Sequence, residues 1–211
     1  MAVFPPRRMG SPAVVVAVAL VALTFEGCGG ARPAPAGGGR LAPDLLPLRS
    51  GRTAAYRLPA AGAAVRRRLP VRGLRCRRAS APGRGVHVEL YARRLVVPVP
   101  AGIGLAPPLQ RSGAYVRGGA CSYPLRTYEP TGVIVVARGR GLSLADLFAV
   151  WGQPLSAHRL AGFHGRVRAY VGGRRWTRAP GRIPLAPHAE IVLEVGAFLP
   201  PHPRYAFPPG L

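Results

Sequence analysis

The chain lacks lysine entirely and has few acidic residues. Its 30 basic residues are all arginine, against seven aspartates and glutamates, for a formal net charge of +23. So few acids leave little scope for catalysis by paired carboxylates. A Gly-x-Ser-x-Gly motif is absent, and no glycine-rich segment has the strand and helix context of a phosphate loop. We therefore assign no catalytic residue and favour a non-enzymatic interpretation.

A surplus of arginine attracts nucleic acid or anionic lipid through electrostatics. Aromatic residues are not interleaved with the arginines as single-strand recognition requires, so the sequence disfavours nucleic acid. The densest basic patches are at 66–68 and 75–78. They could lie on an anionic membrane, and an arginine-driven binder of lipid or nucleic acid is kept as an alternative. We favour a solvated linker.

The first 30 residues have the parts of an export signal or membrane anchor. Arg7 and Arg8 precede an apolar stretch at 13–25, and small residues surround Cys28. The apolar stretch is too short to cross roughly 30 Å of hydrocarbon as a helix. Residues 23–30 resemble a bacterial lipoprotein signal, with Cys28 as the lipidated residue, although Phe25 and Glu26 depart from that pattern. We expect an exported protein on the outer face of the cell membrane or in the envelope; a secreted protein is the alternative.

Composition divides the remaining chain into three regions. Residues 31–85 are rich in Ala, Pro, Gly and Arg, and such a segment cannot offset its ordering entropy by burial, so it predicts a disordered linker. Residues 86–197 predict one α+β domain. Residues 198–211 contain five prolines and predict an extended tail.

Within the domain, hydrophobic periodicity predicts one helix among several strands. Apolar residues spaced as on one helix face predict a helix over 144–151, with Ser143 as its N-cap and Gly152 as its end. Alternating or continuous apolar runs predict strands at 86–91, 95–100, 133–136, 165–171, 174–177 and 190–195. A mixed sheet with the helix across one face would bury these surfaces, and the order is compatible with a β-grasp-like arrangement.

The sequence has three cysteines. If Cys28 takes lipid, Cys76 and Cys121 remain as a pair in an oxidising compartment. Their disulfide would close a loop of about 45 residues and stabilise the fold by about 3–4 kcal/mol. Free thiols and a metal site are the alternatives, and the absence of Cys-x-x-Cys spacing gives a zinc site little support.

Several short motifs recur in the order known from one family. Residues 99–104 read Val-Pro-Ala-Gly-Ile-Gly, 121–125 read Cys-Ser-Tyr-Pro-Leu, and 188–191 read His-Ala-Glu-Ile. Together with 131–134, 144–152 and 167–173, they resemble a family of exported or membrane-anchored bacterial and archaeal proteins of uncharacterised function. The resemblance covers about half of the chain and implies a common scaffold.

The family pattern places histidine clusters on its strands, as His-x-His-x-His-Leu and Leu-His-Thr-His-Asp, and these resemble a transition-metal site. Here the first cluster keeps only His87, with Glu89 beside it, and the second reads Leu-Arg-Thr-Tyr-Glu at 125–129. A residual divalent-metal site would consist of His87, Glu89 and Glu129. Arg126 would oppose an ion there, and we favour a salt bridge from Arg126 to Glu129 or Glu89 in its place.

These observations favour an exported, lipid-anchored envelope protein with a non-enzymatic binding domain whose family metal site is degenerate, and with no cofactor. The alternative is a metal-binding protein or enzyme using His87, Glu89 and Glu129 with a divalent transition metal.

Overall fold

The computed structural model describes residues 59–139 and 141–211. They belong to one compact unit. Three expected features lie outside the described residues. They are the signal at 1–30, its lipidation residue Cys28, and the linker up to residue 58.

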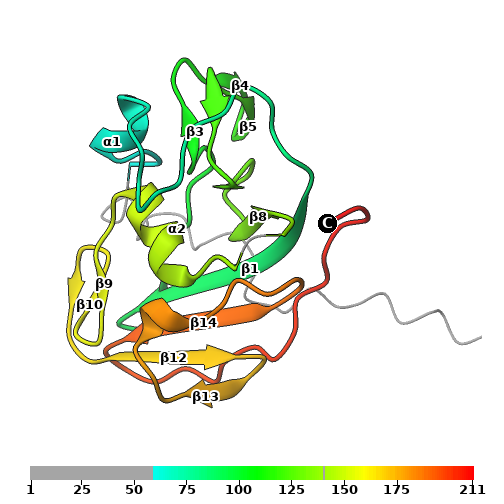
Figure 1. Cartoon of the computed structure of the whole chain (residues 1–211). Helices are drawn as coiled ribbons and strands as arrows, with labels where there is room; N and C mark the ends of the chain where they lie inside the picture. Colours follow the sequence, from blue (N-terminus) through cyan, green and yellow to red (C-terminus); the bar gives the residue numbers. More distant parts are fainter. Residues whose placement is uncertain (1–58, 140) are drawn as a thin grey trace, which may run out of the picture. The chain divides into compact units, whose positions relative to one another are not determined.

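The described chain is mostly β-structure with one principal helix (Figure 1). The main sheet contains β1 (Gly83–Ala92), β2 (Leu95–Val96), β7 (Leu125–Arg126), β8 (Val133–Ala137), β12 (Val167–Val171), β13 (Arg174–Trp176) and β14 (Glu190–Val195). Smaller sheets contain β3 (Leu105–Ala106) with β6 (Cys121–Ser122), β4 (Gln110–Ser112) with β5 (Tyr115–Gly118), and β9 (Leu155–Ser156), β10 (Arg159–Leu160) and β11 (Phe163–His164). The helices are α1 (Ala63–Arg66), α2 (Leu144–Trp151) and the 3-10 helix η3 (Pro180–Arg182).

The main sheet is mixed, with strand order β13-β12-β14-β1-β8-β7 and β2 paired to β1. β1 and β14 are parallel at its centre, and the other neighbours are antiparallel. The first and last long strands, β1 and β14, form the central parallel pair. β8 lies beside β1, and the β12–β13 hairpin, which follows α2 in the chain, lies beside β14. This is the strand order of a β-grasp arrangement. The structure therefore confirms the α+β class.

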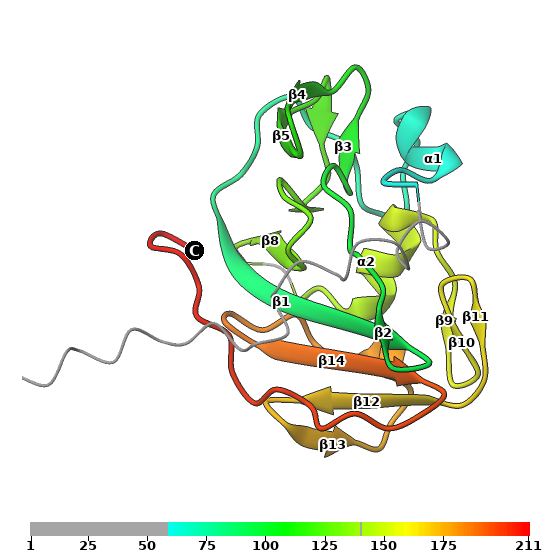
Figure 2. The same cartoon turned by 180° about the vertical axis from the view of Figure 1, so that it is seen from behind.

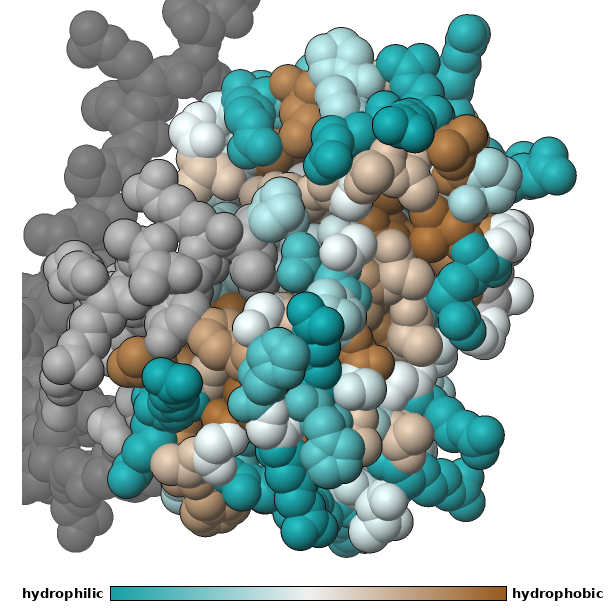
Figure 3. Space-filling view, turned by 90° about the vertical axis from the view of Figure 1, so that its left-hand side faces the viewer, coloured by the Kyte–Doolittle hydropathy of each residue, from teal (hydrophilic) through white to brown (hydrophobic). Residues whose placement is uncertain are grey.

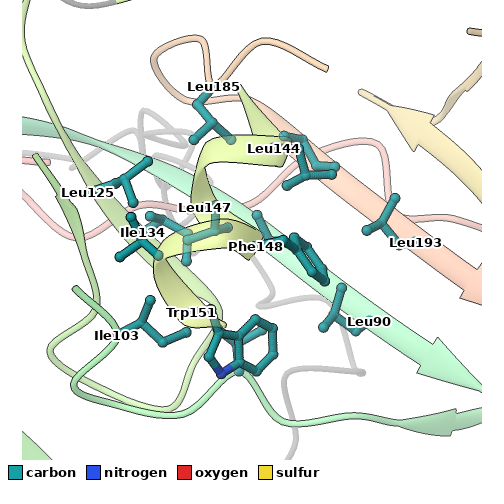
Figure 4. Close-up of a cluster of buried hydrophobic side chains, with 14 of the residues drawn as sticks. Leu90, Ile103, Leu125, Ile134, Leu144, Leu147, Phe148, Trp151, Leu185 and Leu193 are labelled. Atoms are coloured by element: carbon teal, nitrogen blue, oxygen red, sulfur yellow. The ribbon is translucent and has the colours of Figure 1, made fainter. Parts of the chain in front are cut away.

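α2 begins and ends at the residues that the sequence predicted. The Asp146 carboxylate accepts hydrogen bonds from the Ser143 backbone N–H at 2.9 Å and the Ser143 hydroxyl at 2.8 Å. Gly152 ends the helix in the left-handed conformation, at φ 76°, which suits glycine. The apolar face of α2 lies against one side of the sheet (Figure 4), where the core contains Leu90, Ile103, Leu125, Ile134, Leu144, Leu147, Phe148, Trp151, Leu185 and Leu193.

The fold begins before the expected domain boundary at residue 86. Val65, in α1, is fully buried, and the Trp151 indole N–H donates to the Pro59 carbonyl at 2.9 Å. Cys76 forms the predicted disulfide with Cys121, with Cα atoms 5.5 Å apart. Residues 59–85 thus differ from the disordered linker predicted for 31–85, because a few apolar side chains and one disulfide fix them to the domain.

The C-terminal tail at 198–211, predicted as an extended segment, has no regular secondary structure. It runs across the sheet face opposite α2 (Figure 2). Phe198 contacts the Tyr170 ring, and Leu199 packs beside Tyr91, Tyr170 and Val192. We call this side of the sheet, opposite α2, the outer face. The sheet is consequently covered on both sides.

The surface mixes residue types. On the face seen in Figure 3, hydrophilic side chains lie among hydrophobic ones. The large hydrophobic residues that are exposed in the described ranges are Leu69, Tyr115 and Phe198. No helix among the described residues has the length and hydrophobicity to span a membrane.

Candidate functional site

A group of ionisable side chains is buried on the outer face at the centre of the sheet. In β1, Val86, Val88 and Leu90 face the core, so His87 and Glu89 point to the other side. The parallel pairing of β1 with β14 sets His87 opposite Glu190. His202, from the tail, reaches Glu89. We call His87, Glu89, Glu190 and His202 the His87 cluster.

Both ring nitrogens of His87 are engaged. Nε2 lies 2.9 Å from the Thr131 carbonyl oxygen, and Nδ1 lies 2.7 Å from Glu190 Oε2. A carbonyl oxygen can only accept, so Nε2 must carry a proton and donate. A single further proton then lies between Nδ1 and the Glu190 carboxyl. It makes either an imidazolium–carboxylate pair or a neutral imidazole with a neutral acid.

Glu190 is strongly desolvated, with 3% of its surface exposed. Burial raises its pKa above the ordinary value, the nearby Glu89 carboxylate adds to the rise, and the hydrogen bond and charge of His87 oppose it. Its Oε1 atom is buried without a hydrogen-bond partner among the described residues. An orphaned carboxylate oxygen in such a place is costly and favours a bound proton or cation.

Glu89 connects the cluster to its surroundings. Its Oε2 accepts a hydrogen bond from the Tyr91 hydroxyl at 3.0 Å and lies 2.8 Å from His202 Nδ1. Its Oε1 lies 3.9 Å from His87 Nδ1. Glu89 is therefore shared between a residue of its own strand, the tail and His87, all on the outer face.

Tyr205, also from the tail, covers the cluster. Its ring stacks on His87 with centroids 3.8 Å apart and planes inclined by 16°. Burial raises the pKa of the Tyr205 hydroxyl, and the charges of Glu129, Glu190 and Glu89 raise it further. Tyr205 therefore stays a neutral phenol that excludes water from the imidazole.

The structure brings together two of the three predicted metal ligands, His87 and Glu89. One ligand atom from each of His87, Glu89 and Glu190 lies within 4.8 Å of the others, and Glu129 does not belong to this group. The prediction that Arg126 forms a salt bridge is wrong, because no such pair occurs among the described residues. Arg126 instead donates to the Tyr128 hydroxyl at 2.6 Å and the Ala81 carbonyl at 2.7 Å. It lies on β7, and β8 separates it from the cluster strand.

The donors suit a divalent transition metal. Imidazole nitrogen with carboxylate oxygen is a common ligand set for zinc. A metal-bound histidine usually donates its other ring N–H to a carbonyl or carboxylate, which fixes the ring. His87 does so to Thr131 and directs Nδ1 toward the acids. The orphaned Glu190 oxygen and the buried pair of carboxylates also fit a cation.

The sequence analysis did not predict Glu190 and His202 as residues of the site. A signal for Glu190 was present, because a parallel pairing of the first and last strands puts Glu190 beside His87 once the register is known. His202 had no such signal, since it lies among the prolines of the tail.

Comparisons of the chain with protein-family models, with curated proteins and with solved structures find no match. The resemblance drawn from the short motifs therefore stays a prediction.

Proposed function

We propose that this chain is an exported, membrane-anchored domain that binds a divalent transition metal ion, with zinc as the best fit, in the His87 cluster. The observation that carries the proposal is the convergence of ligand atoms from His87, Glu89 and Glu190 within 4.8 Å of one another in a buried position. Glu190 replaces the predicted ligand Glu129, and His202 holds the ligand Glu89 through its ring Nδ1.

Charge supports this assignment. Two carboxylates balance the charge of a divalent ion, and the neutral imidazole of His87 completes a set of three protein ligands. In the protein without metal, the proton between His87 and Glu190 supplies the positive charge that the ion would supply. Metal binding then releases protons and should weaken as the pH falls. Arg126, the cation expected to oppose an ion, is engaged with Tyr128 and Ala81.

Zinc titration of the purified, chelator-treated protein tests the proposal. We expect one zinc per chain by calorimetry and by elemental analysis after dialysis. Glu190→Gln keeps the side-chain shape and should weaken zinc binding by about a hundredfold, and His87→Ala should abolish it. His158→Ala is the matched control, because His158 is exposed and outside the cluster.

Unchanged zinc stoichiometry and affinity in both Glu190→Gln and His87→Ala would refute the site. Circular dichroism and the thermal midpoint of each apo variant separate loss of a ligand from loss of the fold. His202→Ala adds an independent check, since His202 lies on the tail, outside the sheet, and its loss should weaken binding about tenfold by releasing Glu89.

The export and anchoring part of the proposal rests on the sequence. Residues 1–30 have the order of a lipoprotein signal, with Cys28 at the lipid position. The Cys76–Cys121 disulfide suits an oxidising compartment outside the cytoplasm. Mass spectrometry of the N-terminal peptide from membrane fractions should find an acylated Cys28, and Cys28→Ser should move the protein to the soluble fraction. An intact N-terminus at Met1 would contradict lipidation.

A further inference from the structure

A cavity of about 360 Å³ lies on the outer face, beside the His87 cluster but separate from it. Its lining includes the side chains of Arg126, Tyr128, Glu129, Val133, Val135 and Arg138. Val133 and Val135 alternate along β8 with Ile134 and Val136, which belong to the core behind the sheet. The end of the tail, Gly210 and Leu211, closes one side. No member of the His87 cluster lines it.

Arg126 is the unusual residue of this cavity. Its side chain is nearly buried, with 4% of the residue exposed, and its Nη1 atom has no hydrogen-bond partner among the described residues. Tyr128 and Ala81 accept from Nε and Nη2, but both are neutral. No described carboxylate lies within 4.0 Å of the guanidinium, so its charge is uncompensated by an ion pair.

A buried guanidinium without a counter-charge is costly, and an anion that reaches it recovers much of that cost. Arginine binds carboxylates well because its planar N–H groups match the two oxygens. Arg138, exposed on the same cavity, adds a second positive charge. The fixed negative charge of Glu129 limits how much anionic charge the cavity tolerates.

We propose that this cavity binds a small monocarboxylate with a short apolar body. The carboxylate meets Arg126, while the body lies against Val133, Val135 and the Tyr128 ring. Glu129 selects against ligands with more than one negative charge, such as phosphate esters and dicarboxylates. The proposal needs no metal ion and is independent of the zinc site.

Benzoate is the probe, and benzamide is its uncharged isostere. Titrations use the full chain with its disulfide formed, at low ionic strength, with a chelator present so that zinc has no part. We expect benzoate to bind saturably and benzamide and inorganic phosphate to bind at least tenfold more weakly. Arg126→Lys keeps the charge but removes the planar fork, and should weaken benzoate binding about tenfold or more.

Two further variants, at an exposed and a half-buried residue, keep the test decisive if Arg126→Lys fails to fold. Arg138→Ala should weaken benzoate binding about threefold to tenfold, and Glu129→Gln should tighten it about twofold to fivefold because it removes a repelling charge. Arg178→Ala is the matched control, since Arg178 is exposed and does not line the cavity, and it should leave binding unchanged.

Three results would overturn the proposal. The first is that benzoate shows no saturable binding to the wild type. The second is that Arg138→Ala and Arg178→Ala have equal effects, which would mean attraction to the overall positive charge. The third is that phosphate binds as tightly as benzoate, which would mean a general anion site. Failure of zinc binding to the His87 cluster would leave all three readouts unaffected.

Discussion

Tyr205 stacks on His87, with ring centroids 3.8 Å apart, although the two residues come from the tail and the first long strand. Phe207 extends the contact, with its ring centroid 4.9 Å from that of Tyr205. The tail also brings His202 to Glu89. Because α2 covers only one side of the sheet, these contacts make the tail the cover of the outer face.

This relationship predicts that Tyr205→Ala destabilises the domain by about 2 kcal/mol, because an aromatic ring that packs over a buried imidazole is lost. Denaturant unfolding followed by tryptophan fluorescence measures the change. Tyr115→Ala removes the same side chain from a site that is 56% exposed and should change the stability by less than about 0.5 kcal/mol. Equal effects of the two substitutions would mean that the tail does not cover the sheet in solution.

A second prediction concerns the docking of residues 59–85. A Cβ at Gly62 would lie 2.9 Å from the Gly152 Cα, so Gly62→Ala forces two backbone segments apart. The φ of Gly62 is −65°, which alanine adopts readily, so the close approach is the only cause of strain. We expect Gly62→Ala to destabilise the fold by about 1–3 kcal/mol.

Gly162→Ala is the control for that substitution, because nothing lies within 4 Å of a Cβ there and the residue is exposed. Its unfolding free energy should stay within about 0.5 kcal/mol of the wild type. If residues 59–85 behaved in solution as the linker that their composition predicts, Gly62→Ala would be as neutral as the control.

Local patterns in the sequence predicted the elements of the sheet well. The apolar run at 133–136 became the buried strand β8, and Ser143 and Gly152 bound α2 as expected. Both depend on periodicity and capping, which act over a few residues and can be read from them. The Cys76–Cys121 disulfide followed from counting cysteines.

The candidate site could be predicted only in part, because it depends on pairing between distant strands. His87 and Glu89 share one side of β1 by alternation, but Glu190 joins them only through the β1–β14 register. Residues 59–85 were misjudged from proline and arginine content, and the same content did not indicate that the extended tail docks on the sheet. Composition averages over a segment, whereas a few residues such as Val65 and Tyr205 are enough to dock it.

The disulfide gives a third prediction. It joins residues 45 apart, so in the chain-entropy model it stabilises the fold by about 4 kcal/mol. Reduction with dithiothreitol should therefore lower the unfolding free energy by about that amount. The double variant Cys76→Ser/Cys121→Ser should match the reduced wild type and respond no further to reductant. A loss below about 1 kcal/mol would indicate that the two segments are held mainly by packing.

A fourth prediction concerns the start of α2. Burial acts to raise the pKa of Asp146, but hydrogen bonds from Arg72 and Ser143 outweigh it and hold the pKa below the ordinary value of 3.8. Because this pKa is lower in the folded than in the unfolded chain, the stabilisation is complete above the unfolded pKa and is lost as the pH falls through the folded one. At pH 7, Asp146→Asn should be less stable than the wild type by about 1 kcal/mol. The difference should shrink steadily below about pH 4.

Arg72→Ala separates the two sources of this effect. Arg72 Nε lies 2.7 Å from Asp146 Oδ1, but the Arg72 side chain is 56% exposed, so solvent screens the pair and its removal should cost less than about 0.5 kcal/mol. The larger part belongs to the hydrogen bonds from Ser143, which remain in this variant. Unfolding free energies measured between pH 2.5 and 7 for the wild type and both variants distinguish the contribution of Arg72 from that of Ser143. A pH-independent difference between Asp146→Asn and the wild type would show that the Asp146 charge does not act at the helix start.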